Sequence, residues 1–220
     1  MIETVLPTTR LRRVLRGAAC IAVALWACAA APAQAAARTL LVLGDSLSAE
    51  YGLARHAGWV ELMAKRISQA APQYSVVNAS ISGETTSGGV TRLPALMERH
   101  RPDVVVIELG ANDGLRGLPL AAMKDNLQKL VATCRAANAR PLLVGMRLPP
   151  NYGRVYADRF AAVYEEVARE NRVDLVPFLL DGFADQRELF QGDQLHPVAA
   201  AEDRMLDNVW PHLRPLLGTR

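Results

Sequence analysis

Short apolar runs alternate with helix-patterned segments along almost the whole chain after residue 37. Unbroken apolar runs predict buried strands, and apolar residues recurring three and four positions apart predict helices. The predicted strands cover residues 40–43, 74–77, 103–109, 141–146 and 173–176. The predicted helices cover residues 58–70, 86–99, 120–138, 154–171 and 198–217, and Pro94 should kink the second or delay its start. This alternation predicts an α/β fold, a five-stranded parallel sheet with helices on both faces.

The first 37 residues are predicted to be a secretory signal peptide that precedes one folded domain over residues 38–220. Arginines at 10–16 form a basic segment, and an apolar run over 17–31 follows it. Small residues then recur with the spacing of a cleavage site, which places cleavage after Ala35 or Ala37. A membrane anchor is the alternative, but the run is shorter than the roughly 20 apolar residues that span a bilayer. We therefore expect a periplasmic or secreted protein with no stable membrane anchor, and Arg12-Arg13 leaves twin-arginine export open.

The charge argues against a nucleic-acid partner, and the cysteine content excludes an internal disulfide. The formal net charge is +3, and residues 1–37 hold four arginines and one glutamate, which account for all of it. The remaining domain is neutral, so no nucleic-acid partner is expected. Cys134 is the only cysteine after the signal, so the mature chain can form no internal disulfide.

Four polar clusters contain the side chains that a serine hydrolase needs. Ser46, Gly83 and Asn112 each follow one of the first three predicted strands, and the carboxyl ends of parallel strands meet at one edge of the sheet. Asp193 and His196 lie three residues apart, so the aspartate can hold one imidazole nitrogen while the other faces Ser46. Gly83 and Asn112 can donate hydrogen bonds to a developing oxyanion. The clusters together predict a nucleophile, a base, an acid and an oxyanion hole.

Each cluster also has a simpler interpretation. Ser46 could be a turn serine, and Asn112-Asp113-Gly114 could be an ordinary turn, because these residue types favour turns. Asp193 and His196 could bind a metal, but the sequence offers no third and fourth ligand, so no metal is expected. At the level of the whole chain, a flavin-binding electron carrier and a non-catalytic exported binding module remain alternatives.

Four blocks of the sequence resemble the SGNH (GDSL-type) hydrolases, with Ser46, Gly83, Asn112 and His196 at the four positions that name the family. These blocks are residues 44–48, 82–83, 110–113 and 193–197, and a closer resemblance extends over residues 42–49, 82–89, 108–117 and 147–153. The resemblance implies a flavodoxin-like three-layer αβα sandwich, a Ser46–His196–Asp193 triad and an oxyanion hole from Ser46, Gly83 and Asn112. It also implies that the loop around residues 114–119 moves when acyl chains bind.

The same resemblance implies an exported serine esterase with arylesterase, acyl-CoA thioesterase and lysophospholipase activities. We expect a monomer that needs no cofactor and acts on a small-molecule acyl ester or thioester. A polysaccharide O-deacetylase of the same family is the alternative. Glu50 and Ala111 depart from the family pattern, in which glycine is common at both positions. The following residues could line an acyl groove or merely pack their loops: Leu115, Leu118, Leu148, Pro149 and Tyr152.

Overall fold

A computed structural model of the chain describes residues 1–3 and 37–218, and the fold lies in the second of these ranges. Its sheet has five parallel strands in the order β2-β1-β3-β4-β5. The strands are β1 (Arg38–Gly44), β2 (Tyr74–Asn78), β3 (Val104–Glu108), β4 (Arg140–Val144) and β5 (Asp174–Val176). The predicted parallel sheet is therefore confirmed, and its strand order is the flavodoxin-like one.

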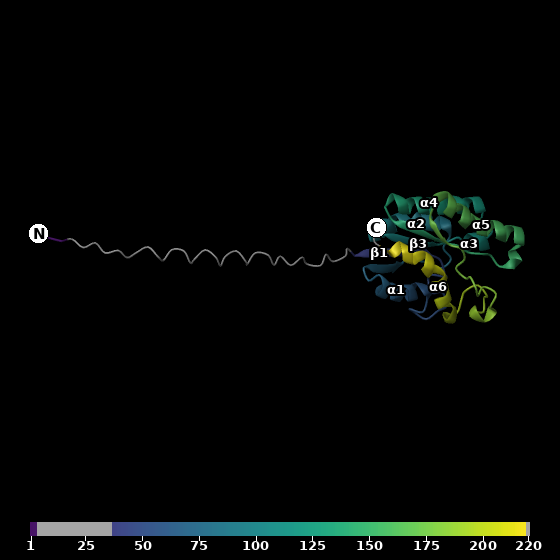
Figure 1. The fold of residues 1–220 in the computed structure, drawn as a ribbon. Helices are drawn as coiled ribbons and strands as arrows, with labels where there is room; N and C mark the ends of the chain where they lie inside the picture. Colours follow the sequence, from purple (N-terminus) through teal and green to yellow (C-terminus); the bar gives the residue numbers. More distant parts are fainter. Residues whose placement is uncertain (4–36, 219–220) are drawn as a thin grey trace. The chain divides into compact units, whose positions relative to one another are not determined.

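Helices cover both faces of the sheet, as Figure 1 shows. Helices α2, α4 and α5 pack together on one face, and α1 and α6 pack together on the other. Their bounds are α1 (Trp59–Ala70), α2 (Thr86–His100), α4 (Leu120–Ala136), α5 (Arg154–Asn171) and α6 (Glu202–Leu213). The predicted three-layer αβα sandwich is thus confirmed.

Burial explains why the central strands consist almost wholly of apolar residues. Every residue of β3 is buried, as are the last five of β1, because helices cover these strands from both sides. The edge strands β2 and β5 each include exposed residues. The one charged residue within β3 is Glu108, which is fully buried at the end of the strand.

Three details differ from the sequence-based expectations. Helix α2 runs through Pro94 from Thr86, so a delayed start at this proline is wrong. The neighbouring Leu93 and Met97 are buried, and their packing offsets the missing backbone hydrogen bond. The final helix, expected as one element over residues 198–217, consists of η3 (Ala199–Ala201), α6 and η4 (Arg214–Leu217).

The third difference lies beyond β3, where a simple turn was one interpretation of Asn112-Asp113-Gly114. A short helix, α3 (Ala111–Leu115), forms there instead, and two further 3-10 turns are η1 (Pro150–Tyr152) and η2 (Arg187–Leu189). The predicted signal segment lies outside the described residues except for its first three residues and Ala37. Within the described residues, no helix is both long enough and apolar enough to cross a membrane.

The sheet order places one junction at the centre of the carboxyl edge. The chain leaves β1 toward β2 on one side, while β3 lies on the other side of β1. Parallel α/β sheets bind ligands at such a switch in strand order, because the loops that leave the two strands diverge. Ser46 follows β1 and Asn112 follows β3, so both predicted site residues lie at this junction.

Candidate active site

Ser46 stands at the end of β1 in a tightly packed turn. A side chain on Gly44 would approach the Glu108 Oε2 and the Ser48 side chain to 2.7 Å, so only glycine fits before the turn. The Asp45 N–H donates to Glu108 Oε2 at 3.2 Å, and the Leu47 N–H donates to Asp45 Oδ1 at 3.0 Å. These contacts fix the backbone on both sides of Ser46.

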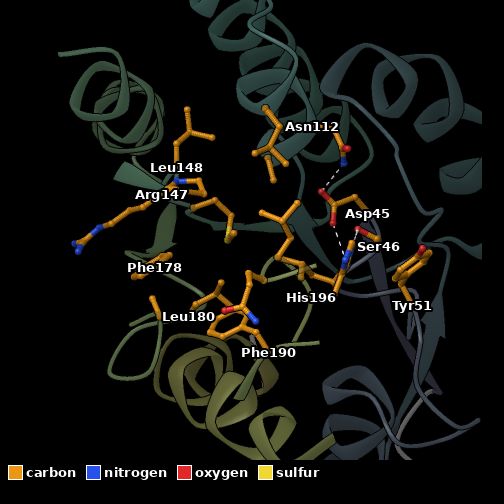
Figure 2. Close-up of a pocket in the computed structure, with 18 of the residues that line it drawn as sticks. Asp45, Ser46, Tyr51, Asn112, Arg147, Leu148, Phe178, Leu180, Phe190 and His196 are labelled. Carbon is orange, nitrogen blue, oxygen red and sulfur yellow. Dashed lines mark hydrogen bonds between the residues drawn. The ribbon is translucent and has the colours of Figure 1, made fainter. Parts of the chain in front are cut away.

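A chain of hydrogen bonds joins Ser46 to His196 and Asp193. His196 Nε2 lies 2.9 Å from Ser46 Oγ, and His196 Nδ1 lies 2.7 Å from Asp193 Oδ2. Figure 2 shows the imidazole pointing at the serine hydroxyl. Because the carboxylate can only accept from Nδ1–H, Nε2 is left as the acceptor for the serine proton. The three residues therefore have the arrangement of a nucleophile, a general base and the acid that orients the base.

Local backbone geometry positions Asp193 and His196. Asp193 Oδ1 accepts from the N–H groups of Leu195 at 2.9 Å and His196 at 3.1 Å, and the Gln191 N–H donates to the His196 carbonyl at 2.7 Å. Partial burial acts to raise the pKa of Asp193, but hydrogen bonds from Leu195 and His196 outweigh it and lower that pKa to about 2. Asp193 is therefore ionised at neutral pH and can hold the imidazole in one orientation.

Gly83 and Asn112, the two expected oxyanion donors, lie with Ser46 in one cavity. Gly83 has a φ of +79°, a conformation that favours glycine, and its carbonyl accepts from Arg116 Nη2 at 2.8 Å. Asn112 Nδ2 donates one hydrogen bond to Asp45 Oδ2 at 3.0 Å (Figure 2). An amide nitrogen carries two hydrogens, so one remains for a substrate oxygen.

Several contacts hold the short helix that carries Asn112. Gly110 precedes it with a φ of +120°, and a side chain there would lie 2.3 Å from the Tyr164 hydroxyl. The next residue after Asn112, Asp113, accepts from the Thr86 N–H at 2.9 Å and the Thr86 hydroxyl at 2.5 Å. The Tyr156 hydroxyl donates to the Gly114 carbonyl at 3.2 Å. Asn112 is thus fixed from α2 and α5, which explains how so short a helix is stable.

Two buried carboxyl groups lie directly behind Ser46. Glu108 Oε2 accepts from the Ser48 hydroxyl at 2.7 Å, while its Oε1 is buried with no hydrogen-bond partner among the described residues. Burial raises the pKa of Asp45 to about 6, although hydrogen bonds from Leu47 and Asn112 lower it. Burial, and then the nearby Asp45 carboxylate, raise the pKa of Glu108 well above its usual range. Sequence reasoning missed this pair, although Glu108, an acidic residue at the end of an apolar strand, indicated a buried carboxyl group.

A largely apolar cavity of about 690 Å³ is lined in part by Ser46 and His196. Three of the five expected groove residues, Leu115, Leu148 and Pro149, line it. Sequence reasoning missed much of the rest of the lining, which the segments after β4 and β5 supply. This part of the lining includes Met146, Phe178, Leu180, Ala184 and Phe190. The apolar run 178–180 directly after β5 was the sequence signal for it.

The other two expected groove residues, Leu118 and Tyr152, do not line the cavity. Leu118 is 38% exposed on the loop after α3, because its N–H donates to the Asp113 carbonyl and turns the chain away. The Tyr152 hydroxyl donates to the Leu115 carbonyl at 3.1 Å, so Tyr152 supports the wall from behind.

The two departures from the family pattern have separate structural settings. Glu50 has a φ of +57°, which explains why glycine is common there, and its carboxylate accepts from the Gly58 N–H at 3.0 Å just before α1. Ala111 is the first residue of α3 and is buried. In residues 37–218 no group of three or more histidine, cysteine, aspartate or glutamate side chains could hold a metal ion.

Comparison of the sequence with known protein families shows which family the chain belongs to. Residues 42–204 match the GDSL-like lipase/acylhydrolase family. The chain belongs to this family. The predicted family and the predicted class of enzyme, a serine esterase, are therefore confirmed. The alternatives of an electron carrier and a non-catalytic binding module are wrong.

Several relatives within this GDSL family are similar over most of their length. Esterase TesA of Pseudomonas aeruginosa is 51% identical over 84% of this chain and 92% of its own. Thioesterase 1/protease 1/lysophospholipase L1 of Escherichia coli is 43% identical over 84% of this chain and 87% of its own. A crystal structure of TesA has a TM-score of 0.80 at 50% identity, covering 81% of this chain and 99% of that one. The esterase EstA from Pseudoalteromonas, in a structure inhibited by monoethylphosphonate, has a TM-score of 0.77 at 40% identity, covering 83% of this chain and all of that one.

Proposed function

We propose that this GDSL-family protein hydrolyses carboxylic esters and thioesters through an acyl-enzyme on Ser46. The observation that carries the proposal is the pair of hydrogen bonds from Ser46 Oγ to His196 and from His196 to Asp193. A serine hydroxyl is a weak nucleophile until a positioned base takes its proton. His196 supplies that base, and the Asp193 carboxylate stabilises the imidazolium that forms.

The first half of the reaction forms the acyl-enzyme. Ser46 Oγ attacks the acyl carbonyl carbon while His196 Nε2 takes the hydroxyl proton. The carbonyl oxygen becomes an oxyanion, which accepts hydrogen bonds from the Ser46 and Gly83 N–H groups and from the free amide hydrogen of Asn112. His196 then gives its proton to the leaving alcohol or thiol as the bond to it breaks.

The second half repeats these steps with water. His196 takes a proton from water, whose oxygen attacks the acyl carbon, and the same donors hold the second oxyanion. Collapse of this intermediate releases the carboxylic acid and returns the proton to Ser46. No step needs a cofactor.

The shape of the cavity supports acyl groups longer than acetyl as substrates. Its walls are mostly apolar, and its volume, about 690 Å³, far exceeds what an acetyl group fills. This favours esters and thioesters of fatty acids over the alternative of polysaccharide O-deacetylation. The relatives named arylesterase, thioesterase and lysophospholipase support the same range of substrates.

We further propose that residues 1–37 direct export and that residues 38–220 act as a periplasmic or secreted monomer. The basic and apolar segments and the two small-residue cleavage sites support this proposal. The intact mass of the exported protein tests it. A chain that begins after Ala35 or Ala37 is expected, and a mature chain that keeps its arginines at 10–16 would contradict it.

Covalent labelling tests the proposed chemistry. A fluorophosphonate should modify Ser46, because an activated serine attacks phosphorus as it attacks a carbonyl. Ser46→Ala and His196→Ala should each abolish labelling and lower ester turnover by orders of magnitude, with folding checked by circular dichroism. Labelling that survives in a folded Ser46→Ala protein would place the nucleophile elsewhere.

A further inference from the structure

An exposed aromatic ring lies against the imidazole of His196. The ring centroids of Tyr51 and His196 are 4.3 Å apart and the ring planes are tilted by 36°. Tyr51 nevertheless keeps 50% of its surface exposed. One part of the ring therefore packs on His196 while another part faces solvent beside Ser46.

Tyr51 also lines the cavity, but it lies on the other side of Ser46 and His196 from most of the apolar wall. Figure 2 shows Leu148, Phe178, Leu180 and Phe190 on one side of Ser46 and His196, and Tyr51 on the other. An acyl chain in the cavity therefore directs the rest of the substrate toward Tyr51. The proposed chemistry requires the same direction, because the leaving oxygen or sulfur must reach His196 Nε2 to receive its proton.

We infer that Tyr51 forms a leaving-group subsite that prefers flat, unsaturated leaving groups, by stacking them on the exposed part of its ring. This inference rests on the proposed esterase function and adds a specificity residue outside the triad and the oxyanion hole. Aromatic rings in offset contact attract each other beyond the effect of buried area alone. A saturated ring of the same size buries similar area without that contact.

One glutamine holds Tyr51 and His196 at a fixed distance from each other. Gln191 Nε2 donates to the Tyr51 carbonyl at 2.8 Å and to the Pro197 carbonyl at 3.0 Å. Gly52 lets this glutamine approach, because any side chain there would lie 2.1 Å from Gln191 Oε1. Gln191 thus ties the loop that carries Tyr51 to the turn that positions His196. A leaving group that packs on Tyr51 is therefore held at a constant distance from His196 Nε2.

The test compares two esters whose leaving alcohols have similar size and acidity but differ in flatness, benzyl butyrate and cyclohexylmethyl butyrate. The ratio of their kcat/KM values is measured for the wild type, Tyr51→Leu and Tyr51→Phe. Tyr51→Leu should lower the benzyl-to-cyclohexylmethyl ratio by about three- to tenfold, the effect of one lost aromatic contact. Tyr51→Phe keeps the ring and should leave the ratio unchanged.

The outcomes separate this inference from the proposed function. An unchanged ratio in Tyr51→Leu would overturn the subsite. If kcat/KM falls equally for both esters, the ratio is unchanged and the ring only supports His196. Fluorophosphonate labelling of Ser46 in Tyr51→Leu shows that the triad still works, because its fluoride leaving group needs no aromatic contact. If the wild type is neither labelled nor active on either ester, the proposed function itself fails.

Discussion

Two aspartates beside the proposed nucleophile, Asp45 and Asp193, have pKa values shifted in opposite directions. Asp45 is buried in the sheet behind Ser46, and burial raises its pKa to about 6. Asp193 lies on an exposed turn, where hydrogen bonds outweigh partial burial and lower its pKa to about 2. The difference shows two environments acting in opposite directions: hydrogen-bond donors favour the charged form of Asp193, and burial away from water favours the protonated form of Asp45.

The comparison extends from these two residues to the two halves of the site. The half that contains Ser46 is built on buried strands, and its polar groups contact other buried groups. The half that contains His196 is a surface turn, and the hydrogen bonds that position Asp193 and His196 span only a few residues. Substitutions in the exposed half should therefore lower activity more than stability, and substitutions in the buried half should do the reverse.

The largest effect is expected for Asp193→Asn, in the exposed half. An amide in place of the carboxylate can hold the imidazole in the wrong tautomer, which in a serine protease lowers turnover by about 10⁴. We expect turnover to fall by roughly 10³–10⁴ while the melting temperature changes little. Asp207→Asn, at an exposed carboxylate on α6, is the control. A large drop in melting temperature for Asp193→Asn would contradict the division of the site into a buried half and an exposed half.

Asn112→Ala should give the next largest effect, because this amide is positioned to donate directly to the oxyanion. Turnover should fall by roughly 10²–10³, the usual loss for one oxyanion donor, with little change in KM. The pKa of Asp45 should rise further, because Asn112 donates one of the hydrogen bonds that lower it. Asn171→Ala, which removes an amide from the far end of α5, is the matched control. Near-normal turnover in a folded Asn112→Ala protein would remove Asn112 from the site.

Stability should fall as pH rises, because the buried acids bind protons more tightly in the folded chain. Burial raises the pKa of Glu202 to about 7, although a hydrogen bond from the Trp59 N–H lowers it, and the pKa values of Asp45 and Glu108 are raised as well. The folded chain therefore holds more protons than the unfolded chain between about pH 4 and 7. We expect a higher melting temperature at pH 5 than at pH 8.

Glu202→Gln isolates one of these groups. The amide oxygen still accepts from the Trp59 N–H, but the side chain cannot ionise. The variant should lose part of the pH dependence, on the order of 1–3 kcal/mol between pH 5 and 8. Asp193, with its lowered pKa, loses stabilisation only below about pH 4 and does not contribute in this window. A melting temperature that depends on pH as in the wild type would show that Glu202 is ionised throughout.

The smallest effect is expected for Ser48→Ala, in the buried half. The Ser48 hydroxyl donates to Glu108 Oε2 at 2.7 Å, so its loss leaves a buried acceptor with one donor fewer. The free energy of unfolding should fall by about 1–2 kcal/mol while ester turnover stays within a few-fold of the wild type. Urea denaturation and a nitrophenyl ester assay measure the two quantities. A loss of turnover comparable to that of Asp193→Asn would break the comparison.

The sequence alone predicted the parts of the fold and site that depend on local patterns. Apolar runs and helical spacing gave the five strands and the main helices, because a buried parallel sheet requires such runs. The clusters around Ser46, Gly83 and Asn112 follow the first three strands, so the sequence itself predicts that they meet at one edge of the sheet. Three of the five expected groove residues also line the cavity.

The parts that could not be predicted depend on contacts between distant segments. The sequence does not show that Glu108 and Asp45 share a buried space, because 63 positions separate them. Leu118 and Tyr152 have the right polarity for a groove, but backbone hydrogen bonds decide which way their segments turn. The stacking of Tyr51 on His196 likewise depends on Gln191, a residue with no pattern of its own.

The 150 positions between Ser46 and His196 have a consequence for how the protein is made. A nascent chain that ends before Asp193 already contains the proposed nucleophile, the other two proposed oxyanion donors and almost all of the cavity lining, but not the proposed base. On the proposed mechanism, its serine should stay unreactive until residues 193–196 have been made and lie beside Ser46. Ester turnover should therefore appear during refolding only after the His196 turn has packed beside Ser46. The rate at which turnover is regained would measure the rate of that step.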